Sequence, residues 1–157
     1  MRNRLHSVLQ VLPGGLAGAV AWWAGLLLVF GPAQALLADP SLQSAKFLAA
    51  FMEPPLPRMA GHPEILAVGL LTIALVHAAV YTTLRPKLNG GAWRRGATFG
   101  LIAWALMVPW FEFYLPWNVM LEPWPLVLLE IVCWLVVMLA VGVSVALAHA
   151  GLDRLKT

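Results

Sequence analysis

Four long stretches of this chain carry almost no formal charge, and this pattern constrains the fold more than any other feature. A helix needs about 20 mostly apolar residues to cross a hydrocarbon core about 30 Å thick. The stretches predict membrane spans at about 14–37, 65–84, 96–115 and 123–148. We therefore expect an all-α integral membrane protein in which residues 1–157 form one membrane domain, a four-transmembrane-helix bundle.

The composition supports lipid as the solvent of this fold. Hydrophobic residues make up 61% of the chain and charged residues only 11%, whereas an ordinary soluble domain has about 25% charged residues. A soluble domain of this size buries only about 70% of its unfolded surface, so too much apolar surface would face water. We expect the lipid bilayer to be the main partner and nucleic acid not to be one, because the net charge of +3 is explained by topology.

The basic residues predict the orientation of the spans. If the four spans alternate, most Lys and Arg residues fall on one side of the membrane: Arg2, Arg4, Arg85, Lys87, Arg94, Arg95, Arg154 and Lys156. Lys46 and Arg58 fall on the other side. By the positive-inside rule we expect both termini to be cytoplasmic. We expect the protein to lie in a bacterial cytoplasmic (inner) membrane.

The first outer loop contains a further helix signal. Asp39-Pro40-Ser41 is typical of a helix start and Glu53-Pro54-Pro55 of a helix end. Apolar residues between them share one face, which predicts a short interfacial helix over about 41–53. The same residues could instead cap the bundle as part of its core.

Small residues four apart predict where helices approach closely. The first span carries such a series, and a second lies in the fourth span, where Gly142 and Ala146 have the same spacing. Within a four-helix chain these series favour internal packing over self-association. The residues expected to pack are Gly14, Gly18, Ala21 and Gly25 in the first span and Ala140 and Ser144 in the fourth.

Glu130 is the most informative single residue, because an acid inside a span costs about 2.5 to 3.5 kcal/mol on insertion scales. It is either a ligand or proton site or a hydrogen-bonded link between helices. Glu112 lies nearer the membrane surface. Aromatic and amide side chains at similar depth form either an aromatic belt or the wall of a ligand pocket: Trp110, Trp117, Asn118 and Trp134.

His77, with Tyr81 one turn further on, lies in the middle of the second predicted span. A histidine there can be a haem ligand, a proton relay, a quinone contact or a hydrogen bond between helices. No second histidine lies at the same depth, Cys133 is the single cysteine, and the chain has no standard metal or catalytic motif. We therefore expect no metal, no cofactor and no enzymatic activity.

Two functions fit these features best. The first is an accessory or scaffolding subunit packed against a larger membrane complex, so that the partner is a membrane protein or a second copy of the chain. The alternative is a small oligomeric proton-coupled transporter or hydrophobic-ligand binder that uses Glu130 in an aromatic cavity in the outer leaflet.

The predicted orientation can be tested with reporter fusions. A reporter after Thr157 should give a cytoplasmic signal, and one inserted between Pro54 and Gly61 should give an external signal. The opposite pair of signals would invert every assignment of membrane side made above.

Overall fold

The computed structural model describes residues 2–155, with side chains from residue 11 onward. In this part of the chain the regular elements are all helices, without a β-strand. Four helical segments are long and apolar enough to cross a membrane: Val11–Leu37, Pro63–Lys87, Ala92–Val119 and Trp124–Arg154. The prediction of an all-helical chain with four membrane-length helices is confirmed.

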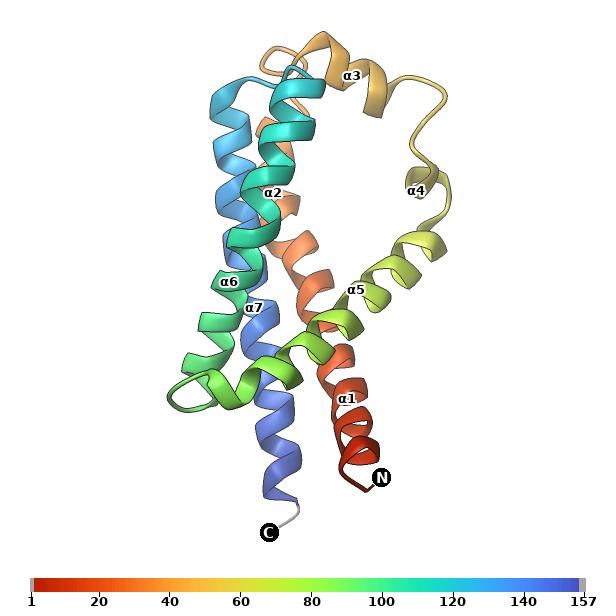
Figure 1. Ribbon diagram of the computed structural model, residues 1–157. Helices are drawn as coiled ribbons and strands as arrows, with labels where there is room; N and C mark the ends of the chain where they lie inside the picture. Colours follow the sequence, from red (N-terminus) through yellow and green to blue (C-terminus); the bar gives the residue numbers. More distant parts are fainter. Residues whose placement is uncertain (1, 156–157) are drawn as a thin grey trace.

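The membrane-length segments are built from several helical elements, some of which follow one another without a break (Figure 1). Two of the elements, η1 and η3, are π-helical. In chain order the elements are α1 (Arg2–Gly25), η1 (Leu26–Phe30), α2 (Gly31–Leu37), α3 (Ala45–Met52), α4 (Arg58–Gly61), α5 (Pro63–Leu84), η2 (Arg85–Lys87), α6 (Ala92–Glu112), η3 (Phe113–Val119) and α7 (Trp124–Arg154).

Two prolines lie inside long helices without ending them. The first span was expected to begin after Pro13, but α1 begins at Arg2 and includes this proline. Pro109 likewise lies within α6, and the helix continues to Glu112 before it widens into η3. Membrane helices tolerate proline because neighbouring groups and local π-helical adjustments satisfy the freed carbonyl groups.

The loop helix α3 begins later than the predicted start. Ser44 is its N-cap, with Oγ accepting a hydrogen bond from the Phe47 N–H at 3.0 Å. Asp39 instead closes a separate turn, in which it accepts hydrogen bonds from the N–H and the hydroxyl of Ser41 at 2.8 and 2.7 Å. These bonds hold the pKa of Asp39 below its usual value. The position of α3 relative to a membrane surface stays a prediction.

The long helices do not pack equally with one another. α6 packs along α7, and α1 packs against both α5 and α7. Figure 1 shows α5 crossing the other helices obliquely, so that its Pro63 end diverges from the bundle. The described ends of α1 and α7 lie together at one end, called here the terminal end, and α3 and η3 lie at the opposite α3 end. Which end faces the cytoplasm stays a prediction.

Glycines bring α6 and α7 into backbone contact. A Cβ atom on Gly96 would lie 2.6 Å from Cα of Val143, and one on Gly142 would lie 2.7 Å from the backbone nitrogen of Gly100. A Cβ on Gly100 would collide with the backbone of Met138. Close approach of this kind holds membrane helices together, since lipid supplies no hydrophobic force between them.

Three glycines of α1 face α7, whereas Gly15 faces Leu75 of α5. A Cβ on Gly18 would lie 3.1 Å from a methyl carbon of its α7 neighbour, and one on Gly25 would lie 2.7 Å from its neighbour. Gly14 lies against a ring on α7. The α7 partners of Gly14, Gly18 and Gly25 are His149, Val145 and Val137, respectively.

The other residues of the two predicted series are placed less uniformly. Ala21 and Ser144 are half-buried, whereas Ala140 is exposed on the surface of α7. Gly142 and Ala146, two positions further along, are buried. The face of α7 that contacts α6 is therefore displaced from Ala140.

Polar contacts join α5 to α7 near the terminal end. Arg85 forms an ion pair with Asp153, and the Thr82 hydroxyl lies 2.9 Å from Nε2 of His149. These contacts fix one end of α5 while its other end diverges.

The α6–α7 contact can be tested with one matched substitution at two glycines. Gly100→Ala should destabilise the protein by about 1 to 3 kcal/mol, because the added methyl group meets the backbone of α7. Gly69→Ala on α5 should have almost no effect, because nothing lies within 4 Å of the added atom. Thermal unfolding in detergent measures both. Equal midpoints would show that the two helices do not depend on this contact.

Candidate functional site

Three glutamates come together at the α3 end. Glu112 is the last residue of α6, Glu122 lies in the turn before α7, and Glu130 lies in α7. Glu112 and Glu122 are only 1% and 2% exposed, and Glu130 is half-buried. The Glu130 carboxyl interacts with both of the others. We call these three residues the carboxyl cluster.

The protonation of the carboxyl cluster follows from the closeness of its members. Two ionised carboxylates have no donor between them, so a hydrogen bond between carboxyl groups requires a proton on one of them. Burial, and next the charge of Glu130, raise the pKa of Glu122 to about 7.

Gln43 and Ser44, just before α3, hold Glu122 in place. The Gln43 amide donates to Oε1 of Glu122 at 2.6 Å and to the Leu37 carbonyl at 2.8 Å. Its own oxygen accepts from the Ser44 N–H at 3.1 Å. The Ser44 hydroxyl donates to the Met120 carbonyl at 2.5 Å. The loop that carries α3 is thereby tied to the turn between α6 and α7.

The turn itself directs Glu122 inward. Leu121 has a φ of 57°, which is the left-handed region that non-glycine residues seldom adopt. Its side chain is exposed while the next residue, Glu122, is buried, and the Glu122 N–H donates to the Pro116 carbonyl at 2.9 Å. Unfavourable backbone conformations of this kind tend to gather at functional sites.

Several buried polar atoms near the cluster lack a hydrogen-bond partner among the residues described. They are Oε2 of Glu112, Oε2 of Glu122 and the indole nitrogen of Trp22. An unsatisfied buried polar atom costs about 1 to 3 kcal/mol. Native proteins contain few of them, and each calls for an explanation such as a bound group.

Two adjoining cavities meet at Glu112. One of about 490 Å³ lies between α1, α5, α6 and α7, and includes Trp22 and Glu112 in its lining. The other, of about 310 Å³, lies beside α3 and is lined in part by Glu112, Glu130 and Phe47. Both are also lined by Trp134. We call the two cavities together the carboxyl groove.

Aromatic rings on three helices form one side of this groove. Trp134 of α7 has its ring centroid 4.6 Å from that of Phe30 and 6.3 Å from that of Trp22. Trp22 in turn lies 5.4 Å from the ring of His77 on α5. The rings thus connect the carboxyl cluster with the middle of α5.

The structure brings only some of the predicted site residues together. Glu112, Glu130 and Trp134 share the groove. Trp110 is 68% exposed, stacks on Tyr114 at 5.8 Å between ring centroids, and only borders the larger cavity. Trp117 and Asn118 are exposed beside a separate hollow that Glu122 also lines.

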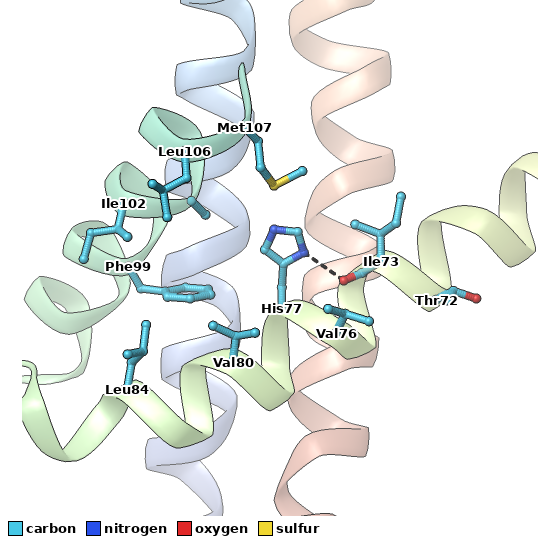
Figure 2. A pocket seen from close by; sticks show the side chains of 11 residues that line it. Thr72, Ile73, Val76, His77, Val80, Leu84, Phe99, Ile102, Leu106 and Met107 are labelled. Atoms are coloured by element: carbon cyan, nitrogen blue, oxygen red, sulfur yellow. Dashed lines mark hydrogen bonds between the residues drawn. The ribbon is translucent and has the colours of Figure 1, made fainter. Parts of the chain in front are cut away.

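The two predicted site residues of α5 lie away from the carboxyl cluster. His77 is buried and borders a third cavity, between α5 and α6 (Figure 2). Tyr81 is 1% exposed, and its ring packs 5.4 Å from Phe99 and 5.1 Å from His149. Tyr81 therefore belongs to the packed core near the terminal end.

The sequence analysis missed Glu122 and Gln43 as site residues. Both lie in segments between spans, where a hydropathy pattern places side chains in water. The sequence did contain one indication of the site. Glu122 lies only eight residues before Glu130, so a turn between them can bring the two acids together.

Within the described residues, no three His, Cys, Asp or Glu side chains are arranged to hold a metal ion. Comparisons of the chain with protein-family models, with curated proteins and with solved structures found no match. The chemistry of the groove is therefore the basis for a functional proposal.

The titration of Glu122 predicts how stability depends on pH. Because its pKa rises from 4.5 to about 7, the folded protein keeps a proton that the unfolded chain has lost between these values. Stability should therefore fall as the pH rises through this window, by at most about 1.4 kcal/mol per pH unit.

Glu122→Gln should flatten this dependence, since glutamine cannot ionise but still accepts from Gln43. Glu53→Gln, at an exposed acid after α3, is the matched control and should keep the wild-type slope. Thermal midpoints at fixed scan rate from pH 4.5 to 8 measure the effect. A wild-type slope in Glu122→Gln would mean that another group titrates.

Proposed function

We propose that this chain is a small membrane protein that binds a cationic amphiphile in the carboxyl groove and releases protons as it does so. The observation that carries the proposal is a cluster of three interacting carboxyl groups, of which the two buried ones each have an unpartnered oxygen. Acids inside a membrane protein mark ion, proton or ligand sites by default.

The ligand class follows from the groove. Oε2 of Glu112 and Oε2 of Glu122 each lack a hydrogen-bond donor. An ammonium group supplies N–H donors together with a positive charge. The apolar and aromatic side chains that line the two cavities with Glu112 suit a hydrocarbon tail. The cavities are within the range of about 300 to 1,000 Å³ that is usual for small-molecule sites.

Proton release follows from charge balance. A cation that enters the cluster favours its ionised form, so protons shared by the carboxyl groups leave as the ligand binds. This exchange is the first requirement of proton-coupled transport. The proposal therefore develops the ligand-binding alternative from the sequence.

The accessory role is a second candidate, and a different observation favours it. The Pro63 half of α5 diverges from the bundle (Figure 1) and its apolar side chains, such as Val68, are exposed. A helix of a partner protein could pack there. An accessory subunit, however, gives no reason to keep three acids buried, so we favour ligand binding.

Binding of decylammonium to the protein in phosphatidylcholine nanodiscs tests the proposal. Titration near pH 7 in weak buffer with a pH indicator should show saturable binding with proton release. In Glu130→Gln the release should be lost and the affinity should fall about tenfold or more, since a charged hydrogen bond contributes about 1.5 to 3 kcal/mol.

Glu53→Gln makes the same chemical change at an exposed position and should behave like the wild type. Binding without proton release, equal in all three proteins, would refute the proposal. The accessory role would be favoured if, in addition, mild extraction recovered the chain in a fixed ratio with another membrane protein.

A further inference from the structure

A third cavity lies between α5 and α6, closer to the terminal end than the carboxyl cluster. Its volume is about 370 Å³, and eleven side chains line it. Figure 2 shows that all the labelled ones are apolar except Thr72 and His77. The Thr72 hydroxyl points away from the ring of His77 and donates to the Val68 carbonyl at 2.8 Å. His77 is therefore the polar group that this cavity presents.

The orientation of the His77 ring is fixed. Nδ1 lies 2.8 Å from the Ile73 carbonyl oxygen, one turn back on α5. The rings of Trp22 and Phe99 meet it edge-on, with centroids 5.4 and 6.2 Å away. The side chain is 7% exposed, and Figure 2 shows the ring pointing toward Met107 across the cavity.

This geometry determines what His77 offers to a ligand. A carbonyl only accepts, so Nδ1 carries the proton of that hydrogen bond. In the neutral ring Nε2 is then an acceptor. Among the residues described, no hydrogen bond to Nε2 is found. The Thr72 hydroxyl is taken by the Val68 carbonyl, and the indole N–H of the adjacent Trp22 makes no hydrogen bond with these residues either.

Several possible occupants do not satisfy this acceptor. An ordered water needs two to four polar partners, but the residues that line this cavity offer it only Nε2 of His77, since the Thr72 hydroxyl is bonded to the Val68 carbonyl. Lipid ester and phosphate oxygens accept and cannot donate. An apolar helix of a partner protein would cover Nε2 without a donor, at the cost of an unsatisfied polar atom.

The cavity is accessible from the lipid side and continuous with the carboxyl groove. Val76, Leu106 and Met107 on its rim are 56%, 77% and 46% exposed. It shares Ile73, Leu106 and Met107 with the larger cavity of the carboxyl groove. A molecule dissolved in the bilayer can therefore reach His77 sideways, between α5 and α6.

We propose that the His77 cavity binds a membrane-dissolved alcohol, whose hydroxyl donates a hydrogen bond to Nε2 of His77 and whose hydrocarbon body lies between α5 and α6. The volume holds roughly a dozen water-sized groups at about 30 Å³ each, which suits an alcohol of about ten carbons. The proposal does not depend on the carboxyl cluster.

The test compares 1-decanol with 1-methoxydecane in nanodiscs of phosphatidylcholine. The two probes have similar length, but the ether has no O–H donor. With histidine labelled by ¹⁵N, decanol should shift the Nε2 resonance of His77 saturably. It should also bind about tenfold more tightly than the ether per mole of lipid, as expected when a buried acceptor gains a donor.

Variants separate this proposal from the previous one. His77→Phe keeps a ring and removes the acceptor, so it should bind both probes equally. His62→Phe, at an exposed histidine before α5, should keep the preference for decanol. Glu130→Gln should also keep the preference for decanol over the ether, whether or not the wild type binds decylammonium.

Two results would overturn the proposal. One is equal affinity of the wild type for decanol and the ether. This measurement uses the wild type alone, so it does not depend on the folding of any variant. The other is a preference for decanol that survives in a folded His77→Phe protein.

Discussion

Backbone contact between α6 and α7 at Gly96, Gly100 and Gly142 is the interaction on which the rest of this structure depends. In lipid, helices associate by packing rather than by exclusion of water, so they stay together where small residues let them approach. α1 meets α7 through its own glycines. Thr82 of α5 and the adjacent Arg85 of η2 make polar contacts with α7 near the terminal end. This unequal packing leaves room between α5 and α6, where the His77 cavity lies.

The carboxyl cluster depends on segments that contribute little to the bundle. Gln43 and Ser44 hold Glu122 and its turn with hydrogen bonds of 2.5 to 2.8 Å. Without the amide of Gln43, another oxygen of the cluster would be buried without a donor, which costs about 1 to 3 kcal/mol. The loop around α3 is thus part of the site, although no membrane-length helix passes through it. Burial of the acids and order in this loop support each other.

The sequence predicts the long helices well because their signal is local. Twenty apolar residues without charge have one stable arrangement in a bilayer, so the four segments follow from hydropathy. Glu112 and Glu130 stand out for the same reason, since each interrupts such a segment. Glu122 and Gln43 could not be placed in this way, because their burial depends on the backbone of Leu121 and on a contact between residues 79 positions apart. The packing face of α7 was equally hard to assign, since Ala140 and Gly142 both belong to small-residue series.

The polar atoms of the groove are not required by the fold. Replacing buried ionisable groups by apolar residues of similar size is often neutral or stabilising, and the glycine contacts of α6 and α7 involve none of the three acids. His77 satisfies one ring nitrogen with a carbonyl of its own helix, so this nitrogen needs no partner helix. The chain therefore keeps acceptors at both ends of one apolar path, a carboxyl oxygen at Glu112 and a ring nitrogen at His77. Because both of them lack donors, a ligand with N–H or O–H groups complements this path better than lipid does.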